Sequence, residues 1–546
     1  MKGTFDLTRE PWVPVLVAGA AISLSLRDLV ERPDDVDALD LADPLAAVAV
    51  LRQVLVPLWI DALGLPADMY EWARRWEDPR SGTSRLLDYL DEHADRFDLL
   101  HPMAPFAQVA GLHTSKNETK PVIVLLPDAA SGNNVPLFSA RTEADPPGLT
   151  LAAAARTLLV AHCFDTAGIK SGAVGDVTAK DGRAYGSNIA PAGQLGLLVP
   201  IAGDLFTTLM LNQPYAGQEN HQIAAGTPQW RRPVADASWQ ERAPDGLLDL
   251  LTWQSRRIRL VPSIPDDEHN DAVVRQVVLA AGDRLGQTPV FEPHTSWRQN
   301  PKPKAGELGQ RPRQHSSGRA PWRGMQALLA TRLATADGET SSMLIRQLAV
   351  LRVEDLVPAD LQVQLLVAQV IYGNMSAIVE DVVVDTLPLP VSALTAESPV
   401  RELLVTMAAQ AGELQKAANH LGDAVRESAG GDRIPWDRSQ RIGDTLVQDL
   451  TPVVRRLLSG LQREPAAAEA ARSAWLAVAS RRALDVVEPV LNAAPVASFA
   501  GRTKKSLNGQ EFTVRLAGAE AAFRKALTEI LGPDPARSAT TTKESA

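Results

Sequence analysis

The chain has 546 residues, of which 45% are hydrophobic, and its formal net charge is −10. A chain of this length exceeds the size at which one hydrophobic core keeps growing, so we expect two or more domains. The acidic balance argues against a protein that coats nucleic acid unaided, because non-specific affinity comes mainly from Lys and Arg side chains that neutralise phosphates.

The first residues, MKGTFDLTREPW, contain acidic residues where a signal peptide has an apolar core. The longest apolar stretch, from Leu45 to Ile60, is interrupted by Arg52. We therefore expect a cytoplasmic protein that does not span a membrane.

The sequence contains one cysteine, Cys163, which excludes an intrachain disulfide and a multi-cysteine zinc site. It lies in the predicted helix TLAAAARTLLVAHCF, where a small buried side chain is the simplest interpretation. The neighbouring His162 points about 100° away around the helix, so it is badly placed to activate the thiol. The nine histidines show no recognisable ligand spacing. We expect no metal and no cofactor.

The segment from Gly168 to Gly196 contains seven glycines and three basic residues. Glycine lets bare backbone approach a ligand that side chains would hold away. A phosphate-binding P-loop needs G-x-x-x-x-G-K-[ST], and GIKS at residues 168–171 departs from that spacing. The run is therefore either a long surface loop or a loop that closely approaches a large or phosphate-rich ligand.

A second unusual segment runs from Arg298 to Arg323 and has seven basic residues against one acid, Glu307. It is also rich in Pro, Gly and Gln. We interpret it as a mobile basic loop, with a solvated linker as the alternative. Its candidate residues, as an auxiliary basic loop, are Arg298, Lys302, Lys304, Arg311 and Arg313.

The distribution of residue types along the sequence predicts an α+β fold in three parts. Residues 1–390 mix amphipathic helices and long Gly/Pro loops with short strands such as Pro121 to Leu126 and Gly196 to Ile201, which predicts a large irregular mixed α/β domain. Residues 391–532 contain four amphipathic helices, which predict a C-terminal four-helix bundle. Residues 533–546 are small and polar, which predicts a disordered tail.

Each predicted bundle helix has one apolar seam with spacings of three and four. In chain order the seams are Leu404, Met407, Ala411, Leu414, Ala418, Leu421 and Val425, then Leu446, Leu450, Val453, Leu457 and Leu461, then Trp475, Ala479, Ala483, Val486 and Val490, then Leu516, Ala519, Phe523, Ala526 and Ile530.

Short motifs follow one another along nearly the whole chain. They are FDLTREPWVPVL at residues 5–16, SLRDLVE at 25–31, HPMAPFAQ at 101–108, SGNNVPLFS at 131–139, the glycine-rich run, LMLNQP at 209–214, FEPHTSWR at 291–298 and IYGNMSAIVE at 371–380. Their order, together with the terminal bundle, resembles the CasA family, the large subunit of the type I-E CRISPR surveillance complex Cascade.

The resemblance implies a binding subunit rather than an enzyme. Such a subunit would recognise the protospacer-adjacent motif (PAM) in duplex DNA, destabilise the adjacent base pairs and pass the target strand to guide-RNA pairing, which starts the R-loop. The implied partners are double-stranded target DNA, the CRISPR RNA 5′ handle, other Cascade subunits and a helicase-nuclease recruited in trans for antiviral defence. The bundle would contact the displaced strand or the distal duplex.

The glycine-rich run resembles the family's glycine loop, which approaches the minor groove of the PAM. We assign the close approach to Gly168, Gly172 and Gly175, with Lys170 near a phosphate. Tyr185 and Gly186 are the alternatives.

The segment from Tyr372 to Ala377 resembles the wedge that separates the first base pair below the PAM, with Asn374, Met375 and Ser376 at its tip. Met375 stands where the family has glutamine, and an unbranched apolar side chain can still insert between base steps. The alternative is that Met375 packs in a helix-capping turn.

Two further elements are implied by the resemblance. Arg284 matches a basic finger, where Arg replaces the family's Lys and suits a narrow, negative groove. The loop SGNNVPLFS resembles the element that contacts the RNA 5′ handle and neighbouring subunits, and its candidate residues are Asn133, Asn134, Leu137, Phe138 and Ser139.

Two rival functions stay open from the residues alone. One is an enzyme that uses the glycine-rich run as a lid over a small phosphate-bearing ligand, although no catalytic constellation stands out in the sequence. The other is a passive scaffold without nucleic-acid contact.

Overall fold

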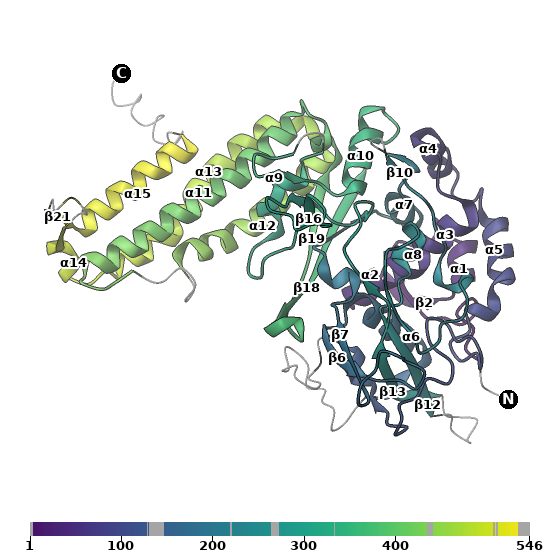
Figure 1. Ribbon diagram of the computed structural model, residues 1–546. Coiled ribbons are helices and arrows are strands. Elements are labelled where there is room, and N and C mark those ends of the chain that lie inside the picture. The colour runs from purple at the N-terminus through teal and green to yellow at the C-terminus, as the bar shows by residue number, and fades with distance from the viewer. Residues whose placement is uncertain are drawn as a thin grey trace. The chain divides into compact units, whose positions relative to one another are not determined.

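The computed structural model describes residues 4–127, 129, 147–218, 221–263, 272–331, 334–433, 441–505, 508 and 511–532. The chain divides into two compact units (Figure 1). Unit 1 comprises Met1–Ser317, Ala330–Val357 and Val363–Thr386, and unit 2 comprises Gly318–Leu329, Pro358–Gln362 and Leu387–Ala546. The fold is α+β, as the sequence predicts: mixed helices and sheets precede a helical C-terminal region.

The largest sheet of unit 1 is mixed. Strand β13 (Val273–Ala281) lies in its centre, antiparallel to β12 (Arg256–Ser263) and parallel to β6 (Gly168–Ser171), and β6 pairs in turn with β7 (Arg183–Ser187). The short strands β4 (Lys120–Pro121) and β5 (Leu149–Thr150) also pair with β13. The glycine-rich run is therefore not one long loop, because it contributes two strands to this sheet.

Helix α6 (Leu151–Phe164) begins at Thr150, whose hydroxyl accepts a hydrogen bond from Ala153 N, and it confirms the predicted helix. Burial raises the pKa of the Cys163 thiol to about 12, and the thiol accepts a hydrogen bond from Gln53. The buried His162 ring lies 2.9 Å from the carbonyl oxygen of Ala107. Both side chains thus serve the core.

The apolar stretch near the N-terminus forms one continuous helical rod in the core of unit 1. It comprises α2 (Pro44–Val50), a π-helical turn (Leu51–Leu55) and α3 (Val56–Leu63). The helix Pro44–Leu63 is long and apolar enough to cross a membrane, yet 94% of its most apolar window is buried inside the protein. It is therefore a core helix of unit 1.

Arg52, which interrupts this stretch, is buried against Glu292 and His294. Burial alone would raise the pKa of Glu292, but the Arg52 guanidinium holds it below its usual range. Pairing with a carboxylate explains how an arginine is tolerated inside an apolar rod.

A three-stranded sheet of unit 1 carries a long β-ribbon. Strand β18 (Gln362–Gly373) lies between β8 (Leu197–Ile201) and β19 (Ile378–Pro390). Strand β8 confirms the predicted strand and pairs with β18 over the residues from Gln364 to Ala368. The ribbon therefore continues beyond β8 as two strands joined at their tip.

The basic segment also forms a sheet, in which β15 (Trp297–Gln299) lies between β16 (Gln310–Pro312) and β17 (Glu339–Thr340). The interpretation of this segment as a mobile loop is therefore wrong for its two strands. Backbone pairing supplies the order that the Pro- and Gly-rich composition does not suggest.

The predicted strand from Pro121 to Leu126 is wrong for most of its length. Only Lys120–Pro121 pairs as a strand, and Val122–Leu125 forms a 3-10 turn with Val122, Ile123 and Leu125 buried. Proline has no N–H to donate to a ladder, so pairing ends there.

The remaining elements of unit 1 are short and surround these layers. The helices are α1 (Leu26–Glu31), α4 (Met69–Glu77), α5 (Thr83–Glu92), α7 (Leu205–Leu211), α8 (Leu247–Leu251) and α10 (Met343–Val353). The strands are β1 (Val13–Val17), β2 (Ala20–Leu24), β3 (Ala38–Leu39), β9 (Gly217–Gln218), β10 (His221–Gln222), β11 (Glu241–Arg242) and β14 (Arg284–Leu285).

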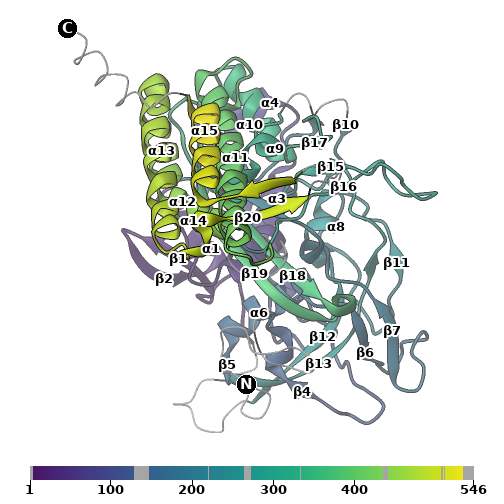
Figure 2. The ribbon, with the colours of Figure 1, turned by 90° about the vertical axis from the view of Figure 1, so that its left-hand side faces the viewer.

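Unit 2 contains the four predicted long helices (Figure 2). They are α11 (Pro399–Ser428), α12 (Ile442–Arg463), α13 (Ala468–Asn492) and α15 (Leu516–Leu531). Smaller elements are α9 (Met325–Leu328), α14 (Ala497–Ala500), β20 (Arg502–Lys505) and β21 (Glu511–Val514). The predicted tail at 533–546 lies outside the described residues.

All seven seam residues predicted for α11 are buried. In the other three helices the buried seam shifts by one residue at later positions of the predicted set, although Leu461 of α12 is buried as predicted. Val454, Leu458, Val487, Leu527 and Leu531 are buried there. Each step of four residues moves the buried stripe by about 40° around the helix, whereas alternating threes and fours would keep it close to one face.

Candidate nucleic-acid interface

The candidate interface begins at the tip of the β-ribbon formed by β18 and β19. Met375 at this tip is 92% exposed and has a backbone φ of 56°, and Ser376 follows with a φ of 60°. Non-glycine residues in the left-handed region carry strain, and such strain clusters at ligand sites. The alternative that Met375 packs in a capping turn is wrong, because its apolar side chain projects into water.

The tip is fastened to the chain segment that joins α6 to β6. Ala167 N donates a 2.9 Å hydrogen bond to Ser376 O, and the Tyr372 hydroxyl donates a 2.5 Å hydrogen bond to Phe164 O. A Cβ built on Gly168 would lie 3.8 Å from the Ala377 Cβ. The wedge-like tip and the start of the glycine-rich run are therefore neighbours, which sequence distance alone does not predict.

A buried cluster of charges holds this joining segment. Asp165 Oδ2 lies 2.6 Å from Lys170 Nζ and also pairs with Arg256 Nε. The Arg256 guanidinium donates further hydrogen bonds of 2.8 Å to Thr166 O and Asn188 O. Fixing two backbone carbonyls beside Ala167 stiffens the segment that anchors the ribbon tip.

Lys170 is thus placed differently from its predicted position near a phosphate. Only 8% of the residue is exposed, and its ammonium faces Asp165. Burial lowers the pKa of Lys170 to about 8. In this arrangement the ammonium is a partner of Asp165 and has no path to a surface phosphate.

Glycine is required at different positions of the glycine-rich run for different structural reasons. Gly168 and Gly175 have φ values of 118° and 95°, which side-chain-bearing residues rarely adopt. A Cβ on Gly172 would lie 2.9 Å from the Ala179 Cβ and from Gly182 C. The turn between β6 and β7 therefore needs Gly172 for its own packing. Val177 beyond it is 92% exposed.

Arg284 lies on β14, which pairs in parallel with β11. Its guanidinium forms a 3.1 Å ion pair with Glu241 and lies 5.1 Å from the centroid of the Trp239 ring. A Cβ on Gly186 would lie 2.8 Å from Arg284 Nη2, so this glycine leaves room for the guanidinium. The structure brings together two residues that the sequence singled out separately, and it holds Arg284 against the protein surface.

Two arginines of the basic segment face each other across strands. Arg298 on β15 is the register partner of Arg311 on β16, and also of Glu339 on β17. Burial, and then the neighbouring Arg311, lowers the pKa of Arg298. Arg313 is engaged with Glu339 at 2.9 Å. Like charges directly opposite each other cost stability, so an anion between them would be favoured.

Arg298 and Arg311 line a polar groove of about 670 Å³ in unit 1. Ser376 of the ribbon tip also lines it, so the groove connects the basic strands with the tip. The other polar lining side chains are Asn188, Gln194, Gln287, Thr288, Asn300, Glu307, Gln310 and Gln314. Amides and guanidinium groups suit phosphates and base edges, which accept and donate hydrogen bonds.

Lys302 and Lys304 lie in the exposed connection between β15 and β16. The predicted RNA-handle residues, Asn133, Asn134, Leu137, Phe138 and Ser139, lie outside the described residues. Among the residues that the structure does describe, no group of three or more His, Cys, Asp or Glu side chains could hold a metal ion.

Sequence reasoning missed Asp165 and Arg256, which lie 91 positions apart and meet only in the folded chain. It also left Tyr372 without a role. The available signal was weak: an Asp directly after an apolar helix and an Arg at the start of a strand are common surface residues. Only their burial in the folded chain shows that these two residues belong to the site.

The comparisons with known proteins agree over most of the chain. Residues 6–486 match the family model of the CRISPR-associated protein Cse1. The CRISPR-associated protein CasA/Cse1 of Thermus thermophilus is 32% identical over 299 residues, which span 52% of this chain and 56% of that relative. The matched region thus covers about half of the curated relative.

Solved structures extend the similarity to the whole fold. The crystal structure of Thermobifida fusca Cse1 has a TM-score of 0.82 at 30% identity, covering 97% of this chain and 98% of that chain. A chain of a CRISPR RNA-guided surveillance complex shares the fold with a TM-score of 0.65 at 21% identity, covering 89% and 98%. Because the family model spans most of its length, this chain belongs to the CasA/Cse1 family of CRISPR-associated proteins.

Proposed function

We propose that this chain is the PAM-recognising, DNA-binding large subunit of a type I-E Cascade complex. It would bind double-stranded target DNA and open the base pairs next to the PAM, so that the guide RNA can start the R-loop. It acts as a binding subunit without catalytic activity, in the cytoplasm. The observation that carries the proposal is the strained, exposed Met375 tip beside a polar groove.

The geometry supports a division of labour between three parts of the interface. Met375, between Asn374 and Ser376, would insert below the PAM, since an unbranched apolar side chain can replace stacking contacts. Arg298 and Arg311 would neutralise phosphates along the groove. The backbone of Gly168 and Gly175 and the surface around Arg284 would face the minor groove.

We assign Lys170 a positioning role instead of a phosphate contact, because Asp165 holds its ammonium in the interior. Lys302 and Lys304 provide additional positive charge near the groove. Gly172 serves the packing of its own turn.

The family relationship, together with the fold shared with a chain of a CRISPR RNA-guided surveillance complex, supports further partners. They are the CRISPR RNA 5′ handle, bound by the loop at residues 131–139, other Cascade subunits, and a helicase-nuclease recruited in trans for antiviral defence. The helical bundle of unit 2 would contact the displaced strand or the distal duplex.

Binding of a PAM-bearing duplex to the guide complex, assembled with and without this chain at one stated salt concentration, tests the proposal. A PAM-scrambled duplex of the same composition is the control. We expect the chain to raise affinity for the PAM duplex about tenfold or more over the scrambled one, as one or two base-specific contacts would. Equal affinity for both duplexes would refute PAM recognition, and a chain that fails to join the complex would refute the subunit assignment.

A further inference from the structure

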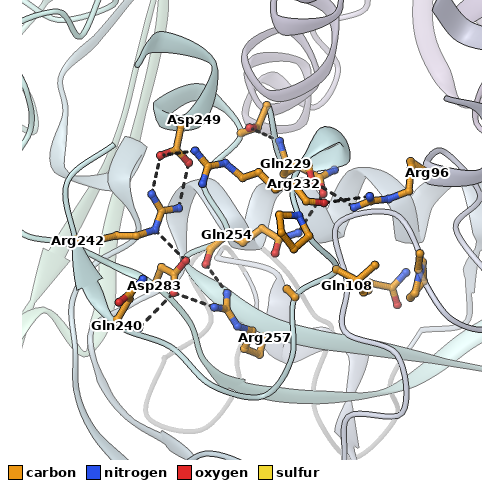
Figure 3. A pocket seen from close by; sticks show the side chains of 16 residues that line it. Arg96, Gln108, Gln229, Arg232, Gln240, Arg242, Asp249, Gln254, Arg257 and Asp283 are labelled. Carbon is orange, nitrogen blue, oxygen red and sulfur yellow. Dashed lines mark hydrogen bonds and ion pairs between the residues drawn. The ribbon is translucent and has the colours of Figure 1, made fainter. Parts of the chain in front are cut away.

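A second cavity of unit 1, of about 230 Å³, lies away from the ribbon tip and is lined by four arginines. Figure 3 shows the guanidinium groups of Arg96, Arg232, Arg242 and Arg257 around it, with two carboxylates, Asp249 and Asp283. It is smaller than the typical drug-sized pocket of about 300–1,000 Å³. A small ligand is the class that it can hold.

Three of these arginines are engaged with the carboxylates. Arg242 lies 2.6 Å from Asp249 and 3.2 Å from Asp283, and Arg257 lies 2.8 Å from Asp283. Arg232 lies 3.1 Å from Asp249 and also pairs with Asp245 outside the lining. This arrangement fixes the cavity wall and leaves one positive charge unmatched, because the four guanidinium groups have three carboxylates, Asp245, Asp249 and Asp283, around them.

Arg96 differs from the other three arginines. Its guanidinium donates to two backbone carbonyls, Arg232 O at 3.0 Å and Gln229 O at 3.3 Å, and within the described residues it has no carboxylate partner. Burial lowers its pKa. A partly buried cation that has only neutral partners is stabilised by an anion that enters the cavity.

An unpaired donor lies on the same wall. The Gln229 side chain accepts a 3.2 Å hydrogen bond from Gln254, which fixes its oxygen. Its buried Nε2 has no hydrogen-bond partner among the described residues. An unsatisfied buried donor costs about 1–3 kcal/mol, so an incoming acceptor is favoured there.

We propose that this cavity is a binding site for phosphate or a small phosphomonoester. Arg96 and Gln229 Nε2 supply the donors that lack anionic or accepting partners, and Arg232, Arg242 and Arg257 supply further guanidinium groups, which Asp245, Asp249 and Asp283 hold in place. The site is separate from the proposed DNA groove. It adjoins Arg284, whose N–H donates to Gln240 O at the rim, so occupation would stiffen the strands that carry this arginine.

Isothermal titration calorimetry of the full chain with inorganic phosphate, at constant ionic strength in a phosphate-free buffer, tests the site. Glycerol phosphate and glycerol are parallel titrants that distinguish a phosphomonoester from its organic part. We expect saturable binding of phosphate, of glycerol phosphate or of both, and no binding of glycerol. Absence of saturable binding for both phosphate compounds would overturn the proposal.

Two variants locate any binding that is seen. Gln229→Glu keeps the size of the side chain and its acceptor for Gln254, but replaces the unpaired donor by a carboxylate. Arg96→Gln removes the unneutralised cation. We expect each to weaken phosphate binding about tenfold or more, the effect of losing one charge-assisted contact.

Arg85→Gln, on the exposed face of α5 in the same unit, is the matched control and should bind phosphate normally. Melting temperatures without phosphate show whether each variant is folded. Unchanged phosphate affinity in the folded Gln229→Glu variant would place the ion elsewhere and overturn the proposal, irrespective of whether the chain reads a PAM.

Discussion

Lys170 and Asp165 show how burial decides the role of a charged residue. Burial alone would raise the pKa of Asp165, but Lys170 and Arg256 hold it below its usual value. The carboxylate thus counters two cations in the interior. Arg256 then has its remaining donors free for the carbonyls that flank the anchor of the ribbon tip.

We predict that Lys170→Met leaves the salt dependence of DNA binding unchanged in the assembled complex. A phosphate-contacting lysine contributes about 0.9 to the slope of log K against log salt for B-DNA, whereas a buried partner of Asp165 contributes none. Binding measured at a series of salt concentrations decides between them. A slope that falls by about one unit in a folded variant would return Lys170 to the phosphate-binding residues.

His162 makes the stability of unit 1 depend on pH. Burial lowers its pKa to about 4 from the ordinary histidine value of 6.5, and within the described residues its Nδ1 has no partner. Between these two values the unfolded chain binds more protons than the folded chain, so stability rises with pH through this window and is lost as pH falls.

We therefore expect the melting temperature to fall more steeply from pH 6.5 to pH 4 in the native sequence than in His162→Gln, which stays neutral and can still donate to Ala107 O. The pH dependence of the free energy of unfolding can differ between the two proteins by at most about 1.4 kcal/mol per pH unit, the value for one proton. Differential scanning calorimetry over this range measures it, and parallel curves for the two proteins would contradict the assignment.

At the scale of elements, the sheet of β15, β16 and β17 turns a basic segment into an ordered surface. Antiparallel pairing puts Arg298 opposite Arg311, whereas a flexible loop would let the two charges move apart. An anion in the groove that both arginines line would offset the repulsion between the two guanidinium groups.

We predict that Arg298→Gln combined with Arg311→Gln lowers the slope of log K against log salt by about two units and weakens binding of PAM and scrambled duplexes alike, because phosphates carry no sequence information. Arg80→Gln, an exposed arginine paired with Asp34, is the control and should leave the slope unchanged. An unaltered slope in the double variant would remove these arginines from the phosphate path.

The elements also show what local sequence patterns can and cannot predict. Helix α11 follows from periodicity, because its apolar seam repeats over many turns. Helix α6 has no such seam, since every residue from Thr157 to Phe164 is buried. Later positions of the other three seams, apart from Leu461, shift by one residue. Val453 and Val454, for example, are both apolar, and only packing selects one of them. The strands of the glycine-rich run depend on pairing with β13, a partner about 100 residues away, and local propensity does not contain that information.

For the molecule as a whole, sequence motifs identified the family and the residues of the ribbon tip. They could not predict that Ser376 lies against Ala167, or that the tip and the basic strands line one groove. Those relations arise from long-range pairing. The buried Asp165 cluster, which fastens the tip, became visible only with the folded chain.

The central claim is that Met375 opens the duplex from a tip whose strain and exposure suit insertion. Met375→Gly removes the side chain and accepts the positive φ without strain, so the fold is preserved. Met103→Gly is a matched control, because Met103 is also largely exposed in unit 1, at 72%.

The most direct measurement compares guide complexes carrying native chain, Met375→Gly or Met103→Gly on two substrates. One is a fully paired PAM duplex, and the other has the same PAM with its first base pairs already mismatched and open. Unstacking costs a few kcal/mol, so we predict that Met375→Gly binds the paired duplex about tenfold or more weakly, and binds the opened one as well as the native complex. Equal binding of the paired duplex by all three complexes, or an equal loss on both substrates, would contradict the account.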